Sequence, residues 1–219
     1  MEIVYQIMMG VSLAACAGFR AYLPLLIMGI MARTGHIQLN PSMQFLTTDT
    51  MLIVFGAASA IEFCGDKFIA VDHFLDAVGT VARPIAGTLL VSAMITKMDL
   101  QTSLILGLIA GGGTALTMHS GKAVARAKST VFAPLHGGLG NMALSCGEDI
   151  LSIGGSLLAV FFPVIAFLGA VIMMAIAVGL IFLGVKAGTK LYKSISSSRN
   201  TAPTPALQNA SAQELNSAL

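Results

Sequence analysis

The feature that most constrains this chain is a series of apolar stretches that contain very few charged residues. Of its 219 residues, 56% are hydrophobic and 10% are charged, whereas a soluble domain has about 25% charged residues. Inside a bilayer such stretches must form helices, because each backbone group then finds its hydrogen-bond partner within the segment. The 23 glycines and 13 methionines suit closely packed membrane helices. We therefore predict an all-α, polytopic integral membrane helix bundle with about six spans.

The apolar stretches divide the chain into six regions. They cover residues 3–32, 51–65, 83–98, 102–118, 131–162 and 164–185. The third region starts at "RPIAG", where Pro84 suits the first turn of a helix. We expect broken or re-entrant segments near residues 18–24 and 134–149, where glycine, proline or charged residues interrupt the apolar pattern. Residues 1–193 then form a transmembrane helical domain, and residues 194–219 form a polar, disordered tail.

The positions of lysine and arginine predict an orientation in the membrane. Six crossings with both termini in the cytoplasm place nine basic residues on the cytoplasmic side: Lys67, Arg83, Lys122, Arg126, Lys128, Lys186, Lys190, Lys193 and Arg199. Only Arg33 and Lys97 then lie outside. Membrane proteins keep an excess of lysine and arginine in their cytoplasmic loops. We therefore expect a multi-pass membrane protein with both termini cytoplasmic. Five or seven crossings stay open, because residues 131–162 could re-enter the membrane.

Arg20 lies inside the first apolar region, in the stretch "AACAGFRAYLPLLIMG". A charge at membrane depth costs about 2.5–3.5 kcal/mol on insertion scales, so a partner has to compensate it. Gly18 and Pro24 bracket a weak point in the helix, where Arg20 is accompanied by Tyr22. Arg20 either lines a functional cavity or forms a structural buried ion pair. Its expected partners are an anionic ligand or one of three carboxylates, Glu62, Glu148 or Asp149.

Two polar stripes are expected to face each other. On a helix with 100° per residue, six side chains of the segment 61–87 fall within about 120°: Glu62, Asp66, Asp72, Asp76, Thr80 and Arg83. A basic stripe follows with His119, Lys122 and Arg126 at positions i, i+3 and i+7. We hypothesise that the two stripes line a polar cytoplasmic vestibule. An amphipathic interfacial helix and a plain positive-inside loop are the alternatives.

The stretch "PLHGGLGNMALSCGEDILS" is the second expected break. Its glycines and Asn141 interrupt a regular helix, and Ser145 with Glu148 has capping-box spacing. Glu148 and Asp149 would then lie at a helix start, where the helix dipole favours acids. The alternative is a discontinuous helix that lines a cavity. We expect no metal or other cofactor, because His136 with these carboxylates matches no metal motif. The three isolated cysteines are expected to be buried free thiols.

Paired interruptions in two halves of a small membrane protein are typical of transporters, which bind substrate near the midplane. The residues that we expect along such a path are Arg20, Tyr22, Glu62, Asp66, Asp72, Asp76, Arg83, His119, Lys122, Arg126, Asn141, Ser145, Glu148 and Asp149.

Four stretches of the chain resemble a known membrane family. "GFRAYLPLL", "DKFIAVDHFLDAVGTVARPIAG", "HSGKAVAR" and "GNMALSCGED", in this order, look like the family of domain of unknown function 4126. The similarity covers about residues 5–185 of this sequence. The positions that match are Arg20, Asp66, Lys67, Asp72, Asp76, Arg83, Pro84, Ser145, Glu148 and Asp149. The resemblance implies a bacterial-type, multi-pass inner membrane protein and implies no particular activity.

Three functions stay open on the sequence alone. The first is a transporter or channel that moves a small ion or anionic solute along the polar path. The second is a non-catalytic assembly or lipid-organising protein, whose charges pair only with each other. The third, a lipid head-group enzyme, is disfavoured because we find no Ser-His-Asp set, HExxH motif or Asp-rich metal motif. The partners we expect are the lipid bilayer and a small ion or anion, not nucleic acid, and the sequence leaves a homo-oligomer open.

The stretch "GLIAGGGTAL" predicts close helix packing.

Overall fold

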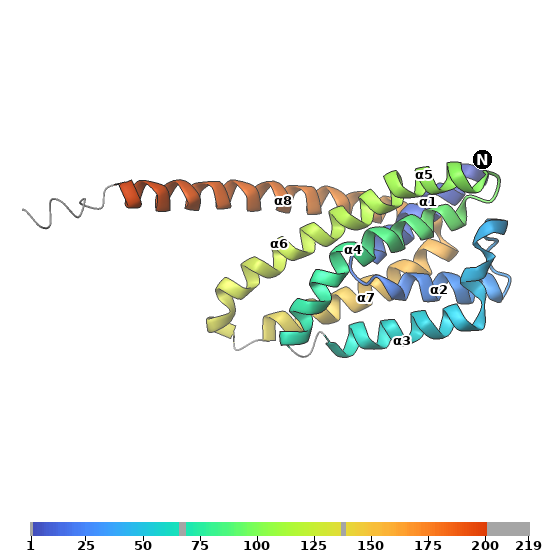
Figure 1. Ribbon diagram of the computed structural model, residues 1–219, viewed down its shortest axis with the longest axis horizontal. Helices are drawn as coiled ribbons and strands as arrows, with labels where there is room; N and C mark the ends of the chain where they lie inside the picture. Colours follow the sequence, from blue (N-terminus) through green and yellow to red (C-terminus); the bar gives the residue numbers. More distant parts are fainter. Residues whose placement is uncertain (1, 66–68, 137–138, 201–219) are drawn as a thin grey trace, which may run out of the picture. The chain divides into compact units, whose positions relative to one another are not determined.

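The computed structural model describes residues 2–65, 69–136 and 139–200, with side chains except at 69–74, 127–136, 139–144, 191 and 194–200. Every regular element in these ranges is a helix (Figure 1), which confirms the all-α prediction. The chain divides into two units, residues 1–181 and 182–219. Within the second unit, the described residues continue helix α8 (Pro163–Asn200).

The first apolar region is broken where the sequence predicts. Helix α1 (Glu2–Ala17) ends just before Gly18, and helix α2 (Tyr22–Arg33) carries Pro24 in its first turn, where the ring displaces no helical hydrogen bond. Gly18 is required by packing: a Cβ there would lie 2.3 Å from the Cβ of Met118. The break is therefore fixed by a close contact with another helix.

The first region turns back on itself at this break. The side chain of Gln6, on α1, donates to Thr96 Oγ1 at 2.8 Å. The segment after α2 reaches the same end of the bundle, because Asn40 hydrogen-bonds to Ile95 and Met98. The start of α1 and the end of α2 therefore lie together, and α1 and α2 run in opposite directions (Figure 1). We call this pair the re-entrant hairpin and residues 18–21 its tip.

Asn40 ties the segment after the hairpin to the end of helix α4 (Ile69–Met94). Its backbone N–H donates to the carbonyl of Ala93 at 2.7 Å. Its amide group donates to the carbonyls of Ile95 at 2.7 Å and Met98 at 3.0 Å, and its Oδ1 accepts from Ser42 N–H at 3.0 Å. This last bond caps the 3-10 helix η1 (Pro41–Thr47), which leads into helix α3 (Asp49–Gly65) at a bend of 59°.

Pro84 lies inside α4 and not at its start, so the predicted helix start at "RPIAG" is wrong. The polar residues before Pro84 have partners on a neighbouring helix, and the chain stays helical through this position. The segment 61–87 also is not one helix, because α3 ends at Gly65 and α4 begins at Ile69.

The next span has three parts, α5 (Leu100–Leu106), a π-helix η2 (Gly107–Gly112) and α6 (Gly113–His136). Asp99 caps α5, and its hydrogen bonds with the side chain and backbone N–H of Thr102 hold the pKa of its carboxyl below the ordinary value. The π-helix packs closely on α4: a Cβ on Gly111 would lie 2.1 Å from the carbonyl oxygen of Gly87. The close packing predicted from "GLIAGGGTAL" is confirmed.

Helix α7 (Leu139–Phe161) is continuous through Ser145, Glu148 and Asp149. The predicted break at the two acids and the capping box at Ser145 are therefore wrong. Both acids instead pair with cations of other segments. Residues 137–138, in the middle of the other expected interruption, lie outside the described residues.

Helix α8 continues past position 194 to Asn200, so the segment predicted as a disordered tail begins as helix, and residues 201–219 lie outside the description.

Three helices in the described residues are long and apolar enough to cross a membrane, Leu75–Met94, Leu100–Arg126 and Pro163–Lys190. A fourth is added if the bent pair η1 and α3 counts as one span. Helices α1 and α2 are apolar but shorter. These helices indicate a membrane protein, and six crossings are not confirmed.

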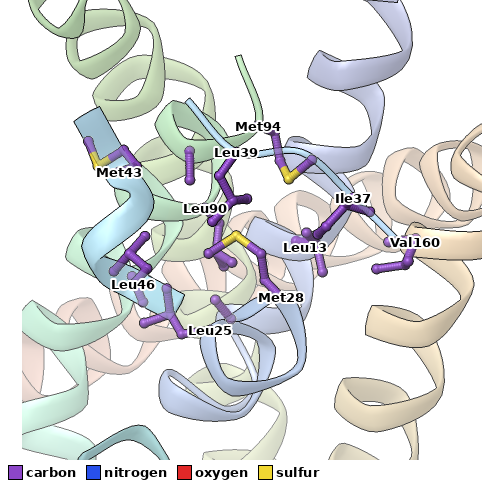
Figure 2. Close-up of a cluster of buried hydrophobic side chains, with 14 of the residues drawn as sticks. Leu13, Leu25, Met28, Ile37, Leu39, Met43, Leu46, Leu90, Met94 and Val160 are labelled. Carbon is purple, nitrogen blue, oxygen red and sulfur yellow. The ribbon is translucent and has the colours of Figure 1, made fainter. Parts of the chain in front are cut away.

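A cluster of buried apolar side chains holds the re-entrant hairpin in place. Figure 2 shows that its members come from α1, α2, the segment 37–46, α4 and α7. Leu13 of α1, Met28 of α2 and Leu90 of α4 have no exposed surface. Membrane helices associate through close van der Waals packing and not through removal of apolar surface from water, and these contacts hold both arms of the hairpin against α4.

Candidate functional site

Nine mostly buried side chains, eight charged and one histidine, gather around the tip of the re-entrant hairpin. They come from the tip, α3, α4, α6 and α7, and we call them the charge cluster: Arg20, Glu62, Asp76, Arg83, His119, Lys122, Arg126, Glu148 and Asp149. The set holds four arginine or lysine side chains and four carboxylates, so these charges balance. Isolated buried charges are very unfavourable, and balance is what makes their burial tolerable.

Arg20 projects from the tip and contacts two other helices. Its Nη2 lies 2.6 Å from Oδ1 of Asp149 on α7. Its Nη1 donates to the backbone carbonyl of Glu62 on α3 at 2.8 Å. The ring of Phe63 lies 6.0 Å from the guanidinium carbon, within cation–π range. Of the three carboxylates expected beside Arg20, Asp149 is the one that forms the ion pair at this distance.

Glu62 connects the tip to α4. Its Oε1 accepts from the backbone N–H of Ala21 at 3.1 Å, just before the start of α2. Arg83 Nη2 lies 3.8 Å from the same oxygen. The other oxygen, Oε2, is buried and has no hydrogen-bond partner among the described residues. Glu62 therefore keeps one oxygen available inside the protein.

The acidic and basic stripes are in direct contact. Arg83 on α4 contacts Nδ1 of His119 on α6 and lies 3.4 Å from Asp76. Thr80 Oγ1 lies 3.2 Å from Nε2 of His119. Asp76 Oδ2 lies 3.6 Å from Nη1 of Arg126. These two stripes were expected to face each other, and those of their side chains that the structure describes are in direct contact.

Helices α6 and α7 are joined by two ion pairs of the cluster that share Glu148. Lys122 Nζ lies 2.8 Å from Glu148 Oε2. Arg126 donates to both oxygens of Glu148, at 3.2 Å from Nε and 2.9 Å from Nη2. Such two-pronged contacts are directional as well as strong. Lys122 also donates to the backbone carbonyl of Phe19 at 3.3 Å, so it holds the tip to α6.

The remaining candidates lie at the edge of this cluster or outside the description. Tyr22 begins α2 and is half-buried against the apolar core. Ser145 lies half-buried on α7. Asp66 is outside the described residues, and for Asp72 and Asn141 the structure describes the helix but not the side chain. Sequence reasoning missed the roles of Ala21 N–H and the Phe19 carbonyl, because backbone groups leave no residue-type signal.

One expectation about the cysteines is wrong. Cys16 is buried, but Cys64 and Cys146 are exposed on α3 and α7. A thiol is apolar enough for a surface that faces lipid, so apolar sequence context does not require burial in the protein. In the described part of the chain, no group of three or more histidine, cysteine or acidic side chains is placed to hold a metal ion.

A cavity of about 430 Å³ borders the charge cluster between α6, α7 and α8. Lys122, Arg126 and Glu148 line one part of it, and the rest of its lining is apolar or glycine. A second cavity of about 160 Å³ shares Phe19, Met118, Leu151 and Met173 with the first. All lining residues precede position 182, so both cavities lie within the first unit.

Comparison with known proteins gives one match. No curated protein and no solved structure matches the chain. A family model described as a domain of unknown function, DUF4126, matches residues 7–182. This range contains the whole charge cluster and every residue that lines the two cavities. The chain belongs to the DUF4126 family, as its sequence motifs had indicated.

Proposed function

We propose that the protein is a small transporter or channel that moves a small ion or anionic solute across the inner membrane. The observation that carries this proposal is the position of Arg20, buried in the charge cluster at the tip of the re-entrant hairpin. Non-helical backbone at membrane depth is tolerated only where it is buried in protein or lines a cavity. Charged side chains at such a depth mark ion and substrate pathways in membrane proteins.

For the orientation we propose five crossings, formed by α3, α4, the span of α5 to α6, α7 and α8. Glu2 forms an ion pair with Lys97, so the N-terminus lies on the side of Lys97, which the positive-inside rule places outside. The C-terminus is then cytoplasmic. This differs from the expectation of two cytoplasmic termini, but the count of nine cytoplasmic against two external basic residues is unchanged, because no basic residue precedes Arg20.

In this orientation the hairpin enters from outside. Helix α1 has 16 residues, so its 1.5 Å rise per residue carries the tip up to about 24 Å into a core of about 30 Å. The charge cluster then lies nearer to the cytoplasmic face than to the midplane. A solute has only a short polar distance to cover between the cluster and the cytoplasm.

A second function is favoured by a specific observation. The cluster's charges pair with each other, which is what a lipid-organising or assembly protein requires. Transport instead needs these pairs to open and exchange partners. The two functions therefore differ in whether the reconstituted protein carries a flux.

The test is a flux assay in liposomes that contain the full-length protein. Proton, chloride, phosphate and acetate movements are followed with internal dyes or electrodes. We expect wild-type protein to carry at least one of them above empty liposomes, and Arg20→Gln to reduce that flux by at least about tenfold, or about 1.4 kcal/mol. Arg33→Gln is the matched control, because Arg33 pairs with Asp49 at the exposed end of the bundle.

Retained helicity and a single size-exclusion peak would show that each variant is folded. Folded wild-type protein that passes none of the four solutes would refute transport of this class and favour the lipid-organising function. Equal flux in both variants would show that Arg20 does not lie on the transport path.

A further inference from the structure

The two cavities lie next to each other along α8, and we treat them as one apolar space. They share four lining residues, and they extend together from Leu180 to Ala166, which are 14 positions apart on the helix. At 1.5 Å per residue this is about 21 Å. One leaflet of a hydrocarbon core is about 15 Å deep, half of the full thickness. The space is therefore long enough for one extended acyl chain.

Small residues form part of the lining of this space. Gly121 and Ala125 on α6 and Ala177 on α8 line the larger cavity, and Gly155 on α7 lines the smaller one. Gly147 also lines the larger cavity, and a Cβ built on it meets no atom within 4 Å. The volume of about 430 Å³ falls in the range of about 300–1,000 Å³ that is typical of sites for small molecules.

One end of the space is charged. Lys122, Arg126 and Glu148 line it there, with two positive charges against one negative charge. Lys122 is buried, and among the described residues its Nζ has two acceptors, Glu148 and the carbonyl of Phe19. An ammonium group has three donors, so one donor remains for a ligand. The two cations at the wall suit the head of a ligand with a single negative charge, which would add to the contacts that they already make.

We propose that the cavity binds a long-chain carboxylate, with its head on Lys122 and its chain along α8. A compact inorganic anion would leave the apolar length empty, and a neutral lipid would bring no negative charge to the remaining donor of Lys122. As a substrate class this inference rests on the proposed transport function, but binding is measured separately from flux.

The test uses tritiated palmitate and the full-length protein in lipid nanodiscs. Gly147→Leu fills the cavity from α7 without meeting a neighbouring atom at Cβ, and Gly154→Leu is its matched control. Gly154 lies on the same helix, is equally open at Cβ and lines neither cavity. We expect saturable binding in wild-type protein and in Gly154→Leu, and binding at least about tenfold weaker in Gly147→Leu.

Two competitors separate the head from the chain. Acetate carries only the charge and hexadecanol carries only the chain, so each should displace palmitate at least about tenfold less well than unlabelled palmitate does. Equal displacement by either competitor would overturn the proposal, as would equal affinity of the two leucine variants or an absence of saturable binding. Palmitate binding without flux of any of the four small solutes would support the site and count against transport of those solutes. Small-ion flux without palmitate binding would support transport and count against the palmitate site.

Discussion

The contact between α4 and the π-helix η2 gives the sharpest stability prediction. A Cβ at Gly111 would lie 2.1 Å from the carbonyl oxygen of Gly87 and 2.7 Å from a methyl group of Val91. At Gly113, two residues further along, a Cβ meets no atom within 4 Å. The pair Gly111→Ala and Gly113→Ala therefore adds the same methyl group to a closed and to an open position of one span.

The expected magnitude follows from these distances. Ordinary van der Waals contact begins at 3.4 Å, so Gly111→Ala requires a separation of about 1.3 Å from a backbone atom that cannot rotate away. Overpacking of this kind costs about 1–3 kcal/mol. Alanine is favoured over glycine within a helix by about 0.5–1 kcal/mol, and Gly113→Ala gains this term alone. Gly111→Ala gains the same term, so we expect the free energies of unfolding of the two variants to differ by the overpacking cost, about 1–3 kcal/mol.

The measurement is reversible unfolding in mixed micelles, followed by circular dichroism as the fraction of denaturing detergent is raised. Gly113→Ala should unfold at the same or a higher fraction than wild-type protein, and Gly111→Ala at a lower one. If the two variants unfold together, α4 and η2 do not pack at the distance described, and the reasoning fails.

Two further predictions concern the hydrogen bonds of Asn40 and the orientation of the chain in the membrane. Asn40→Ala removes three hydrogen bonds and leaves the carbonyls of Ile95 and Met98 without this donor, so at about 1 kcal/mol per bond the free energy of unfolding should fall by about 2–4 kcal/mol. Gln44→Ala, which removes one long bond of 3.5 Å near the same loop, should change it by less than about 0.5 kcal/mol, and similar losses in both variants would contradict the role of Asn40. In spheroplasts with a sealed inner membrane, an epitope tag at the N-terminus should be reached by an external protease and a tag at the C-terminus should not; protection of both tags would refute the proposed orientation.

The sequence predicted the break near Arg20 because that signal is local. Gly18 and Pro24 weaken a helix wherever they occur, and a buried arginine needs a counter-charge. The reversal of the chain at the break was not predictable in the same way. It depends on Gln6 and Asn40, which reach partners more than fifty positions away in the sequence.

The wrong prediction of a helix break within α7 has a related cause. Ser145 and Glu148 have the spacing of a helix cap, but the same i, i+3 spacing places two side chains on one face of a continuous helix. Only the position of α6 distinguishes the two interpretations, because Lys122 and Arg126 bind Glu148 there. The cavity was equally unpredictable, since most of its lining residues are apolar or glycine and come from segments that are far apart in the sequence.

The two neighbouring acids of α7 have a mechanical consequence. Adjacent side chains on a helix point about 100° apart, and here Glu148 holds α6 while Asp149 holds Arg20 at the hairpin tip. Helix α7 therefore holds two other segments of the protein through two neighbouring side chains that point in different directions. A rotation large enough to release one cation would misalign the other acid as well. Any working cycle of this protein must either move α6, α7 and the tip as one block or exchange both ion pairs in a single step.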